Sequence, residues 1–502
     1  MNYNIHSLNN SLKEYLIKIN DLDNDLIDIS NFEVDYNLKP LIKFKNIIEK
    51  DLDKKFLIVG DYDCDGICAT TIIKLLFNSL NVKSNYFIPS RLKQGYGIDK
   101  ETIEIAYKND FECLLLLDNG INAIEEINRA NELGISVYII DHHEYQELPD
   151  AKAILHSNFL CSPYLDLCTG SLTCLLANCF NNNILYTIYG GLASLADMVK
   201  VIGYNRFLLI NMLNLLKEND IDTISLLLGN NEISYESLSF NVIPKINAVS
   251  RLEKGINANH VVKYLLKEDM FKYLSLIERI NQERKDLSNI YYQEAINVID
   301  ENKDIIVYTS KTIPEGICGI IANRLMYEYN KAIIVLSEKE NEYIGSGRAP
   351  TDFNLYEFLK IKEELYSSYG GHNHAIGIKI DKDKFNSFCE YLNNSEINYP
   401  ITSKDVILID QDNLDLNLLK QLEQLKPFGS GFNEPIFCIK NIKYDSKFIL
   451  KNKYPKFNLS NFIEAISFNE KFKDVDFNDM IFQLRRSNYN PNRISLLIED
   501  LI

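Results

Sequence analysis

Three short apolar segments, each followed by acidic residues, constrain the fold of this chain most strongly. Residues 56–60 (FLIVG), 114–117 (LLLL) and 137–140 (VYII) are uninterrupted apolar runs, and a helical pattern follows each of them. Runs of this length that alternate with helices are typical of buried parallel strands. The sequence therefore predicts an α/β domain built on a parallel sheet.

Polar residues stand directly after each predicted strand. They are Asp61, Asp63 and Asp65 after the first strand, Asp118 after the second, and Asp141, His142 and His143 after the third. The carboxyl ends of parallel strands meet at one edge of a sheet, and ligands bind outside that edge. We therefore expect these side chains to lie close together.

Asp197 adds a fourth acidic position. It lies in an Ala-, Gly- and Leu-rich stretch over residues 187–201, which we expect to form a buried helix. A carboxylate in such a helix is costly to bury unless it is paired or binds a metal. Carboxylates mixed with imidazoles suit Mn²⁺ or Mg²⁺ better than a thiolate-bound metal. The groups together predict a site for two divalent cations, which would activate water and stabilise the leaving oxygen in a phosphoryl displacement.

Simpler explanations account for parts of this pattern. An acidic surface turn would explain the aspartates at 61–65 alone, a helix cap would explain any single Asp, and His143 could be a core histidine. The string from Asp61 also resembles the start of an EF-hand loop, but its twelfth position is Ile72 instead of glutamate, and a strand precedes it. No P-loop and no GxGxxG follows the first predicted strand, which argues against an NTPase or a dinucleotide enzyme. Four sites in this order favour the metal centre.

Length and composition limit the remaining organisation. The 502 residues suggest two to four domains. The N-terminus lacks a secretion signal, and no apolar run approaches the ~20 residues of a membrane helix. Ten cysteines without a C-x-x-C pair argue against a zinc knuckle or a disulfide framework, and we interpret Cys64, Cys68, Cys174 and Cys179 as small buried side chains. We therefore expect a cytoplasmic protein with no membrane association.

The downstream pattern predicts a long helix, a second α/β domain and a barrel. Residues 261–300 lack Pro and Gly and carry apolar residues at helical spacing. The alternation of strand-like and helical segments restarts at residue 304. From about Pro427, short strand-like segments alternate with turns, as in a small β-barrel.

The net charge of −17 is unusual for a chain that binds nucleic acid, but the charge is unevenly distributed. Residues 436–502 carry 11 Lys and Arg against 8 Asp and Glu. A locally basic module can follow a phosphate backbone. Aromatic residues that could stack on bases stand among these lysines, namely Phe437, Tyr444, Phe448, Tyr454 and Phe457. Because a barrel also needs an aromatic core, we expect about half of them to be buried.

Taken together, the motifs resemble those of a known family. GDYDCDG, LLDNGI, DHH and LASLADMVKVIGYNRFL are similar to the motifs of the DHH phosphoesterase superfamily, specifically of its RecJ-type single-strand exonucleases. The likeness continues through IPKINAVSRL, PEGICGIIANRL, GSGRAP and YGGHNHAIG to KPFGSGFNEPIF and SLLIEDLI. It covers roughly residues 50–502 in the order of the family.

The resemblance implies an α/β architecture: a parallel-sheet DHH catalytic domain, a long connecting helix, a smaller α/β DHH-associated domain and a C-terminal OB-like β-barrel. The expected boundaries are 1–45 for an N-terminal extension, 46–260 for the catalytic domain, 261–300 for the connecting helix, 301–400 for the DHH-associated domain, and 401–502 for a connector with the barrel. The active site is expected in the cleft between the two α/β domains. Such a cleft would admit a single strand and exclude a duplex.

The resemblance also implies roles for single residues. The implied metal ligands are Asp63, Asp65, Asp118, His142 and Asp197. The implied catalytic residues are Asp61 as a supporting acid, His143 facing the scissile phosphate, and His372 near the metals, unless His372 is a plain loop histidine. The positions that match those holding the 5′ phosphate or nearby backbone are Arg91, Arg251, Ser346 and Arg348. Guanidinium forks bind phosphate oxygens bidentately, although each arginine could instead be a solvated surface residue.

The implied activity is a metal-dependent, single-stranded-DNA-specific 5′→3′ exonuclease that uses two Mn²⁺ or Mg²⁺ ions. It would release 5′-mononucleotides in DNA recombination and repair, as a monomer, with a helicase and a single-strand-binding protein as partners. Departures from the family pattern, such as Glu144-Tyr145 after DHH and the GSGRAP string, affect substrate contacts and no metal ligand. One alternative is a DHH enzyme with a smaller substrate, such as an oligoribonuclease or nucleotide phosphatase, and the C-terminal module counts against it. The other is an inactive replication scaffold, and the complete ligand set counts against that.

Overall fold

A computed structural model provides the fold of the chain. The structure describes residues 2–502 except 9–10, 93, 96, 396, 398, 400–402 and 488–489, and it describes the backbone but not the side chain of His372. Two compact units are present. The central unit comprises Glu33–Val199 and Leu208–Pro400, and the terminal unit comprises Met1–Phe32, Lys200–Phe207 and Ile401–Ile502.

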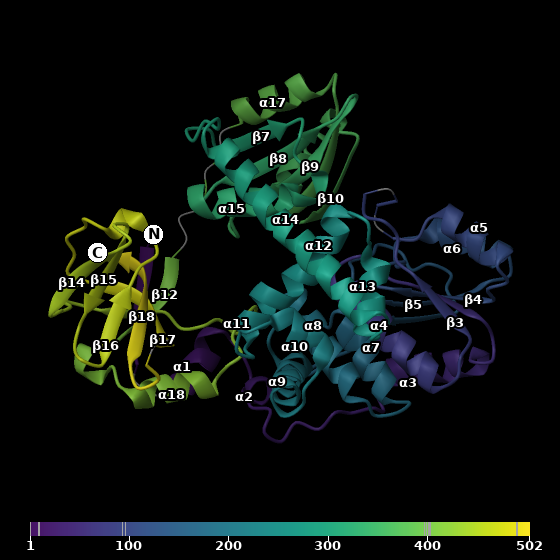
Figure 1. Ribbon diagram of the computed structural model, residues 1–502, viewed down its shortest axis with the longest axis horizontal. Helices are drawn as coiled ribbons and strands as arrows, with labels where there is room; N and C mark the ends of the chain where they lie inside the picture. Colours follow the sequence, from purple (N-terminus) through teal and green to yellow (C-terminus); the bar gives the residue numbers. More distant parts are fainter. Residues whose placement is uncertain are drawn as a thin grey trace. The chain divides into compact units, whose positions relative to one another are not determined.

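The first half of the central unit is a five-stranded sheet in which all neighbouring strands are parallel (Figure 1). In spatial order its strands are β3 (Ser84–Phe87), β2 (Phe56–Val59), β4 (Cys113–Leu117), β5 (Ser136–Asp141) and β6 (Ala153–His156). The residues of β2 and β4 are all buried, as their continuous apolar runs require. The parallel sheet predicted from these runs is confirmed.

The direction in which strands are added reverses beside β2. The chain passes from β2 to β3 on one side and then returns to place β4 on the other side. Such a switch point leaves a crevice at the carboxyl ends of the two central strands, where ligands of parallel sheets bind. The residues that follow β2 and β4 therefore lie at the position best suited to a ligand.

Helices cover both faces of this sheet. They are α3 (Lys39–Ile48), α4 (Cys64–Ser79), α5 (Lys100–Lys108), α6 (Ile124–Glu132) and α7 (Thr169–Asn178). Val59 shares an apolar cluster with Ile103 of α5 and Ile127 of α6. Phe56, three positions earlier, points to the opposite face, where its ring centroid lies 5.1 Å from that of Phe77 of α4. The alternation along β2 thus gives each face its own core.

A helical region follows the sheet. It contains α8 (Ile184–Ala196), α9 (Gly203–Glu218), α10 (Asp222–Leu228), α11 (Tyr235–Ser237), α12 (Ile243–Leu252), α13 (Ala258–Leu265) and α14 (Met270–Ile296). The long helix expected over residues 261–300 is divided between α13 and α14. Lys267 and Asp269 interrupt it because their φ angles of 64° and 44° are left-handed. The 27 residues of α14 then continue as one helix.

The second half of the central unit has a mixed five-stranded sheet (Figure 1). Its strands in spatial order are β10 (Ser368–His372), β11 (Ala375–Asp381), β9 (Glu342–Arg348), β8 (Ala332–Glu338) and β7 (Ile305–Ser310). Its helices are α15 (Cys318–Tyr329), α16 (Leu355–Lys360) and α17 (Phe385–Asn394). Leu359 of α16 and Phe388 of α17 share one apolar cluster with Ile334 of β8. The smaller α/β domain predicted from residue 304 onward is confirmed.

The terminal unit is built on an eight-stranded sheet. Its strands in spatial order are β1 (Asn2–Ser7), β12 (Ser403–Leu408), β13 (Phe437–Ile439), β17 (Met480–Arg486), β18 (Ile494–Leu501), β16 (Ile463–Ile466), β15 (Tyr454–Asn458) and β14 (Ser446–Leu450). Helices α1 (Leu12–Ile19), α2 (Asn24–Ile27) and α18 (Leu416–Gln424) accompany the sheet. Phe437, Phe457 and Phe482 are fully buried in its core.

The N-terminal residues belong to this same unit. Strand β1 pairs in parallel with β12, and the Tyr3 hydroxyl donates a hydrogen bond of 2.8 Å to Oδ2 of Asp500. Both chain ends accordingly lie in this unit (Figure 1). The sequence indicated an N-terminal extension over residues 1–45, but the first 32 of these residues form part of the terminal unit.

A short internal segment, Lys200–Phe207, completes the terminal unit. The guanidinium of Arg206 is buried and donates hydrogen bonds to the backbone oxygens of Ile27, Leu425 and Pro427 at 2.8–2.9 Å. A buried charge is tolerated when its donors are satisfied. Arg206 therefore joins three segments of this unit that are distant in the sequence.

In the part of the chain that the structure describes, no helix combines the length and apolar character needed to cross a membrane. All ten cysteines are free thiols. Cys64, Cys68 and Cys174 are buried as expected, whereas Cys179 is only partly buried.

Candidate metal centre and adjoining anion pocket

The turn between β2 and α4 carries three of the predicted acidic residues. Asp63 is the N-cap of α4, and its Oδ1 accepts hydrogen bonds from the backbone N–H groups of Asp65 at 2.9 Å and Gly66 at 3.2 Å. Glycine is required at position 66 because a Cβ there would lie 2.6 Å from the backbone oxygen of Asp61. This tight turn holds the three carboxylates at the edge of the sheet.

Asp118 follows β4 in a left-handed conformation with a φ of 63°. Its backbone N–H donates to the oxygen of Ile140 at 3.1 Å. The side-chain amide of the next residue, Asn119, donates to the backbone oxygens of Val59 at 3.1 Å and Leu117 at 2.8 Å. These bonds hold the ends of β2, β4 and β5 together, so the side chains that follow the three strands converge.

Asp141 is the fully buried last residue of β5 and fixes the orientation of the two histidines after it. Its carboxylate accepts from the backbone N–H groups of His142 at 2.8 Å, His143 at 3.2 Å and Ile121 at 3.2 Å. Nδ1 of His143 lies 2.7 Å from its Oδ1. Burial raises the pKa of Asp141, but the hydrogen bond and charge of His143 and the backbone donors outweigh burial and lower it. The sequence did not indicate this positioning role.

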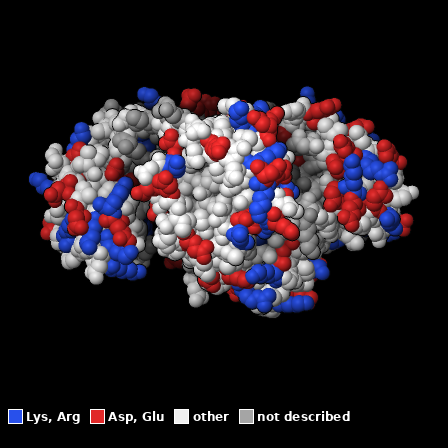
Figure 2. Space-filling view, turned by 90° about the horizontal axis from the view of Figure 1, so that it is seen from above, with Lys and Arg blue, Asp and Glu red and all other residues white. Residues whose placement is uncertain are grey.

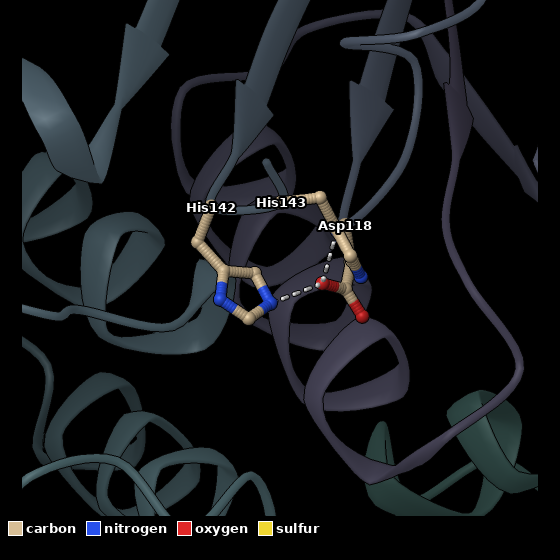
Figure 3. Close-up of side chains that lie close together, drawn as sticks. All are labelled: Asp118, His142 and His143. Atoms are coloured by element: carbon tan, nitrogen blue, oxygen red, sulfur yellow. Dashed lines mark ion pairs between the residues drawn. The ribbon is translucent and has the colours of Figure 1, made fainter. Parts of the chain in front are cut away.

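Both imidazoles point toward the same oxygen of Asp118 (Figure 3). Nε2 of His142 lies 3.3 Å from Oδ1 of Asp118 and 3.8 Å from Oδ2 of Asp65. Nδ1 of His142 lies 3.8 Å from Oδ2 of Asp197, and Nδ1 of His143 lies 4.0 Å from Oδ1 of Asp118. Residues from four separate segments of the sequence thus meet at one point.

Three groups of potential ligand atoms result, and within each group the atoms all lie within 4.8 Å of one another. The groups are Asp61, Asp63 and Asp118; Asp118, His142 and His143; and Asp65, Cys168 and Asp197. Two of the groups share Asp118, and His142 lies 3.8 Å from both carboxylates of the third. The structure therefore brings together every predicted metal ligand, along with Asp61 and His143. Cys168, which the sequence did not single out, joins them.

The electrostatics of this cluster suit a cation. Burial and neighbouring carboxylates raise the pKa of Asp61, Asp63 and Asp118 above the ordinary value, and raise that of Asp197 to about 8. Oδ1 of Asp61 is buried and has no hydrogen-bond partner among the described residues. A buried carboxylate oxygen without a partner is unfavourable. A cation would remove both this penalty and the mutual repulsion, and the mixture of oxygen and imidazole donors fits Mn²⁺ or Mg²⁺.

The amino end of α7 supports the cluster from the protein interior. The backbone N–H groups of Thr169 and Gly170 donate to Asp65 at 2.9 and 2.7 Å, and the Thr169 hydroxyl donates to Asp118 at 3.1 Å. The positive end of the helix dipole therefore faces the carboxylates. Thr169 lies 104 residues after Asp65, so no local sequence pattern pointed to this contact.

Asp197 is placed differently from the sequence-based expectation. The sequence placed it inside a buried apolar helix, but α8 ends at Ala196, and Asp197 is the C-cap residue with 31% of its side chain exposed. Burial nevertheless remains the largest cause of the raised pKa of Asp197. A carboxylate at the negative end of a helix is also unfavourable, and a bound cation would compensate for it.

A pocket of about 780 Å³ adjoins the cluster at His143. Its lining includes three of the four predicted phosphate-binding residues, Arg91, Ser346 and Arg348. Ser346 and Arg348 lie two positions apart on β9 and so share one face of the strand. The guanidinium of Arg91 lies 5.1 Å from the ring centroid of Tyr62. The lining thus comes from both α/β halves of the central unit.

The arginines around this pocket have no carboxylate partner within the described ranges. Arg348 donates to the backbone oxygen of Gly347 at 2.7 Å, and Arg251 donates to that of Gly316 at 3.1 Å. Arg251 does not line the pocket, but the charges of Arg91 and Arg348 act on it. Burial is the largest cause that lowers the pKa of Arg251 to about 9, and these neighbouring arginines lower it further. Like charges held together without an ion-pair partner are suited to binding an anion.

His372 is the predicted site residue whose side chain lies outside the described part of the structure. Its backbone ends β10 and pairs with Ala375 of β11. Gly370 and Gly371, which precede it, line the pocket. A contact between His372 and a phosphate therefore stays a prediction.

Comparison with known proteins places this geometry in a family. Residues 55–196 match the DHH family N-terminal domain, residues 302–395 match the DHHA1 domain, and residues 407–500 match the RecJ OB domain. The three matches follow one another in the order expected from the motifs. The chain is a RecJ-type member of the DHH family. The OB domain expected at the C-terminus is thereby confirmed.

Curated RecJ proteins are similar over most of this chain. The single-stranded-DNA-specific exonuclease RecJ of Bacillus subtilis is 28% identical over 77% of the chain and 52% of its own length. RecJ of Thermus thermophilus is 24% identical over 84% of the chain and 65% of its own length. RecJ of Haemophilus influenzae is 25% identical over 89% of the chain and 88% of its own length. The chain thus matches between about half and two thirds of the first two relatives.

The folds of solved RecJ structures agree. RecJ from Thermus thermophilus in complex with Mn²⁺ matches 100% of this chain and 79% of its own, with a TM-score of 0.85 and 19% identity. An exonuclease RecJ bound to manganese matches 72% of this chain and 95% of its own, with a TM-score of 0.61 and 23% identity. At this identity the likeness establishes the shared RecJ fold.

Proposed function

We propose that this chain is a divalent-metal-dependent exonuclease that degrades single-stranded DNA from its 5′ end and releases 5′-mononucleotides in DNA recombination and repair. One observation carries the proposal: a cluster of acidic and imidazole groups adjoins a pocket lined by arginines that form no ion pair among the described residues. Such a pair of sites would hold metal ions next to a phosphate group. The names of the curated relatives point to the same substrate.

In this proposal the metal ligands are Asp63, Asp65, Asp118, His142 and Asp197, with Asp61 as a supporting acid. They would hold two Mn²⁺ or Mg²⁺ ions, the ions present in RecJ crystals from Thermus thermophilus. When bound, the ions would act as Lewis acids on the phosphate and lower the pKa of an attacking water. The unpartnered oxygen of Asp61 and the crowded carboxylates support this assignment.

His143 would stabilise the charge that develops on the scissile phosphate. It lines the pocket and is fixed by Asp141. Burial lowers the pKa of His143, but the hydrogen bond and charge of Asp141 outweigh burial and raise it to about 8. A protonated imidazole can donate to a phosphate oxygen, and positioned donors of this kind stabilise the transition state. We propose that His372 contacts the same phosphate from β10.

The polarity of the reaction would follow from the arginine-lined pocket. We propose that Arg91, Arg251, Ser346 and Arg348 hold the terminal 5′ phosphate. The end of the strand would then lie one nucleotide from the metal ions, so cleavage would start at the 5′ end and release mononucleotides.

The terminal unit would bind the strand beyond the active site. Of the aromatic residues predicted to stack on bases, Phe437 and Phe457 are buried, whereas Tyr444 and Phe448 are 43% and 51% exposed. Phe462 and Phe468, which the sequence analysis did not include, are 68% and 66% exposed. We propose these exposed rings as stacking platforms for bases.

The same proposal retains the functional division of the chain. Residues 46–260 and 301–400 would form the two sides of the active site, residues 261–300 would connect them, and residues 401–502 would hold the strand. We further propose that the protein works in the cytoplasm as a monomer, with a helicase and a single-strand-binding protein as partners.

The alternatives are less well supported. A smaller-substrate DHH phosphoesterase would not need the domain that matches the RecJ OB domain at residues 407–500. An inactive scaffold would not need to keep three groups of potential ligand atoms, each with its atoms within 4.8 Å of one another.

The deciding experiment uses single-stranded DNA labelled at the 5′ or the 3′ end, incubated with Mn²⁺, Mg²⁺ or EDTA. We expect metal-dependent release of labelled mononucleotide from the 5′-labelled strand and little digestion of duplex DNA. Digestion in excess EDTA would refute the metal centre. Products that shorten from the 3′ end would refute the 5′→3′ direction.

A further inference from the structure

A second basic pocket lies between α14 and α15, apart from the metal centre. It has a volume of about 230 Å³. Arg284, Lys285 and Asn289 line it from α14, and Arg324 lines it from α15 together with two isoleucines. None of these residues belongs to the predicted site.

Both arginines of this pocket are oriented by neutral groups. Nε and Nη2 of Arg284 donate to Oδ1 of Asn281 at 3.2 and 2.8 Å. Nη1 of Arg324 donates to Oδ1 of Asn289 at 2.8 Å, and its guanidinium lies 3.5 Å from the ring centroid of Tyr292. Amide oxygens and an aromatic face fix a guanidinium without neutralising its charge. The full positive charge therefore stays available.

No carboxylate lines this pocket among the described residues. Two acidic residues of α14 have other partners, because Glu283 forms an ion pair with Lys254 and Asp286 accepts a hydrogen bond from Gln282 at 2.9 Å. The guanidinium groups that line the pocket are therefore held in place without an acidic partner among its lining residues.

The positive charge of this pocket extends toward the active-site pocket. Arg251 is the link, because after burial the charges of Arg91, Arg284 and Arg348 lower its pKa. Arg284 therefore belongs to the smaller pocket and also lies within electrostatic range of the arginines beside the metal centre. Each pocket thus contributes an arginine whose charge acts on Arg251.

We propose that the pocket between α14 and α15 is a second anion site that binds a phosphate group. Two guanidinium forks and an ammonium group are the donors that phosphate oxygens prefer. The phosphate would belong either to the DNA strand or to a released nucleotide. This choice rests on the proposed function, whereas the anion site itself does not.

The test compares the wild-type protein with the double variant Arg324→Gln/Lys285→Gln. Both side chains are exposed, so the fold should tolerate their loss. The matched control is Arg279→Gln, an exposed arginine of α14 that does not line the pocket. EDTA is present throughout, so binding is measured without cleavage.

Two arms distinguish the sources of the phosphate. The first arm measures the affinity for a single-stranded oligonucleotide with a 5′-hydroxyl as a function of salt. If the strand occupies the pocket, log K of the double variant should depend less steeply on log salt. The magnitude of the slope should fall by about 0.7 for each phosphate contact removed. The second arm titrates thymidine 5′-monophosphate by calorimetry. If the nucleotide occupies the pocket, the double variant should bind one nucleotide fewer than the wild type.

A change in either arm that the Arg279→Gln control does not share supports the site and identifies its occupant. Unchanged binding in both arms, or an equal change in the control, overturns it. Because neither arm requires hydrolysis, a wild-type protein that binds normally but fails to cleave DNA would count against the proposed function alone.

Discussion

Three arginines of the terminal unit differ from two arginines of the central unit in the partners of their guanidinium groups. In the terminal unit, Arg485, Arg486 and Arg493 each form an ion pair with a glutamate of the same unit. In the central unit, Arg91 and Arg348 have no carboxylate partner among the described residues, and the carboxylates at the strand ends crowd one another instead.

This difference separates structural charges from charges that are available to a ligand. In each of these partly buried pairs, the glutamate compensates the charge of the arginine. Like charges held together are unfavourable until a ligand compensates them. The positive surplus of residues 436–502 is therefore a weak indicator of DNA binding. Basic and acidic side chains are accordingly interspersed on the face of the terminal unit shown at the left of Figure 2.

The largest effect should come from the crowded carboxylates. Asparagine at position 118 keeps the size of the side chain and tolerates the left-handed φ of 63°. We expect Asp118→Asn to reduce hydrolysis by about 10²–10³-fold, as for the loss of one preorganised electrostatic group. In EDTA the same variant should melt at a higher temperature than wild type, because it relieves repulsion.

Initial rates in Mn²⁺ and melting followed by circular dichroism in EDTA measure these two effects. Asp150→Asn, an exposed acid of the same unit, is the matched control and should change neither quantity. A fully active Asp118→Asn protein would show that Asp118 is not needed to bind the metal ions. A lower melting temperature of this variant in EDTA would show that the carboxylates do not destabilise the fold by repulsion.

The second prediction concerns the arginines without carboxylate partners. Arg348→Ala should depress cleavage of 5′-phosphorylated DNA more than cleavage of 5′-hydroxyl DNA, by about 1.5–3 kcal/mol, the range of a charge-assisted hydrogen bond. Initial rates on the two substrates measure the difference. Lys379→Ala, on neighbouring β11 and already paired with Glu342 at 2.6 Å, serves as the control. Equal losses on both substrates would mean that Arg348 does not recognise the terminal phosphate.

The central unit also shows why much of the site could be predicted from the sequence. Each acidic residue directly follows an apolar run, so its place at the sheet edge depends on a strand only a few residues away. The parallel arrangement then brings these edges together. Local patterns and one general rule were sufficient for Asp61, Asp118 and His142.

Contacts between distant segments could not be predicted in this way. Thr169 supports Asp65 across 104 residues, and β1 pairs with β12 at the opposite end of the chain. The end of α8 before Asp197 also escaped prediction, because the apolar pattern continues through residues 198–201. Tertiary packing decides each of these features, and the local sequence carries no pattern for it.

The smallest effects should distinguish paired charges from exposed rings within the terminal unit. Deleting residues from about 436 onward would be a poor test, because it removes strands that enclose the core shared with β12 and α18. Point substitutions keep this core. Phe448 on β14 is about half exposed. Arg485 on β17 forms an ion pair with Glu434.

We expect Phe448→Ala to weaken binding of single-stranded DNA by about 1–3 kcal/mol, the range for one base stacked on an aromatic ring, with an unchanged salt slope. Arg485→Gln should change the affinity by less than about 0.5 kcal/mol, as for substitutions away from a binding surface. It should lower the melting temperature, because Glu434 loses its partner. Fluorescence anisotropy at several salt concentrations, in EDTA, measures both affinities. The opposite outcome is that Arg485→Gln weakens binding as much as Phe448→Ala and also reduces the salt slope. That result would mean that the paired charges of the terminal unit contact DNA. Pairing would then not separate structural from ligand-binding charges in this protein.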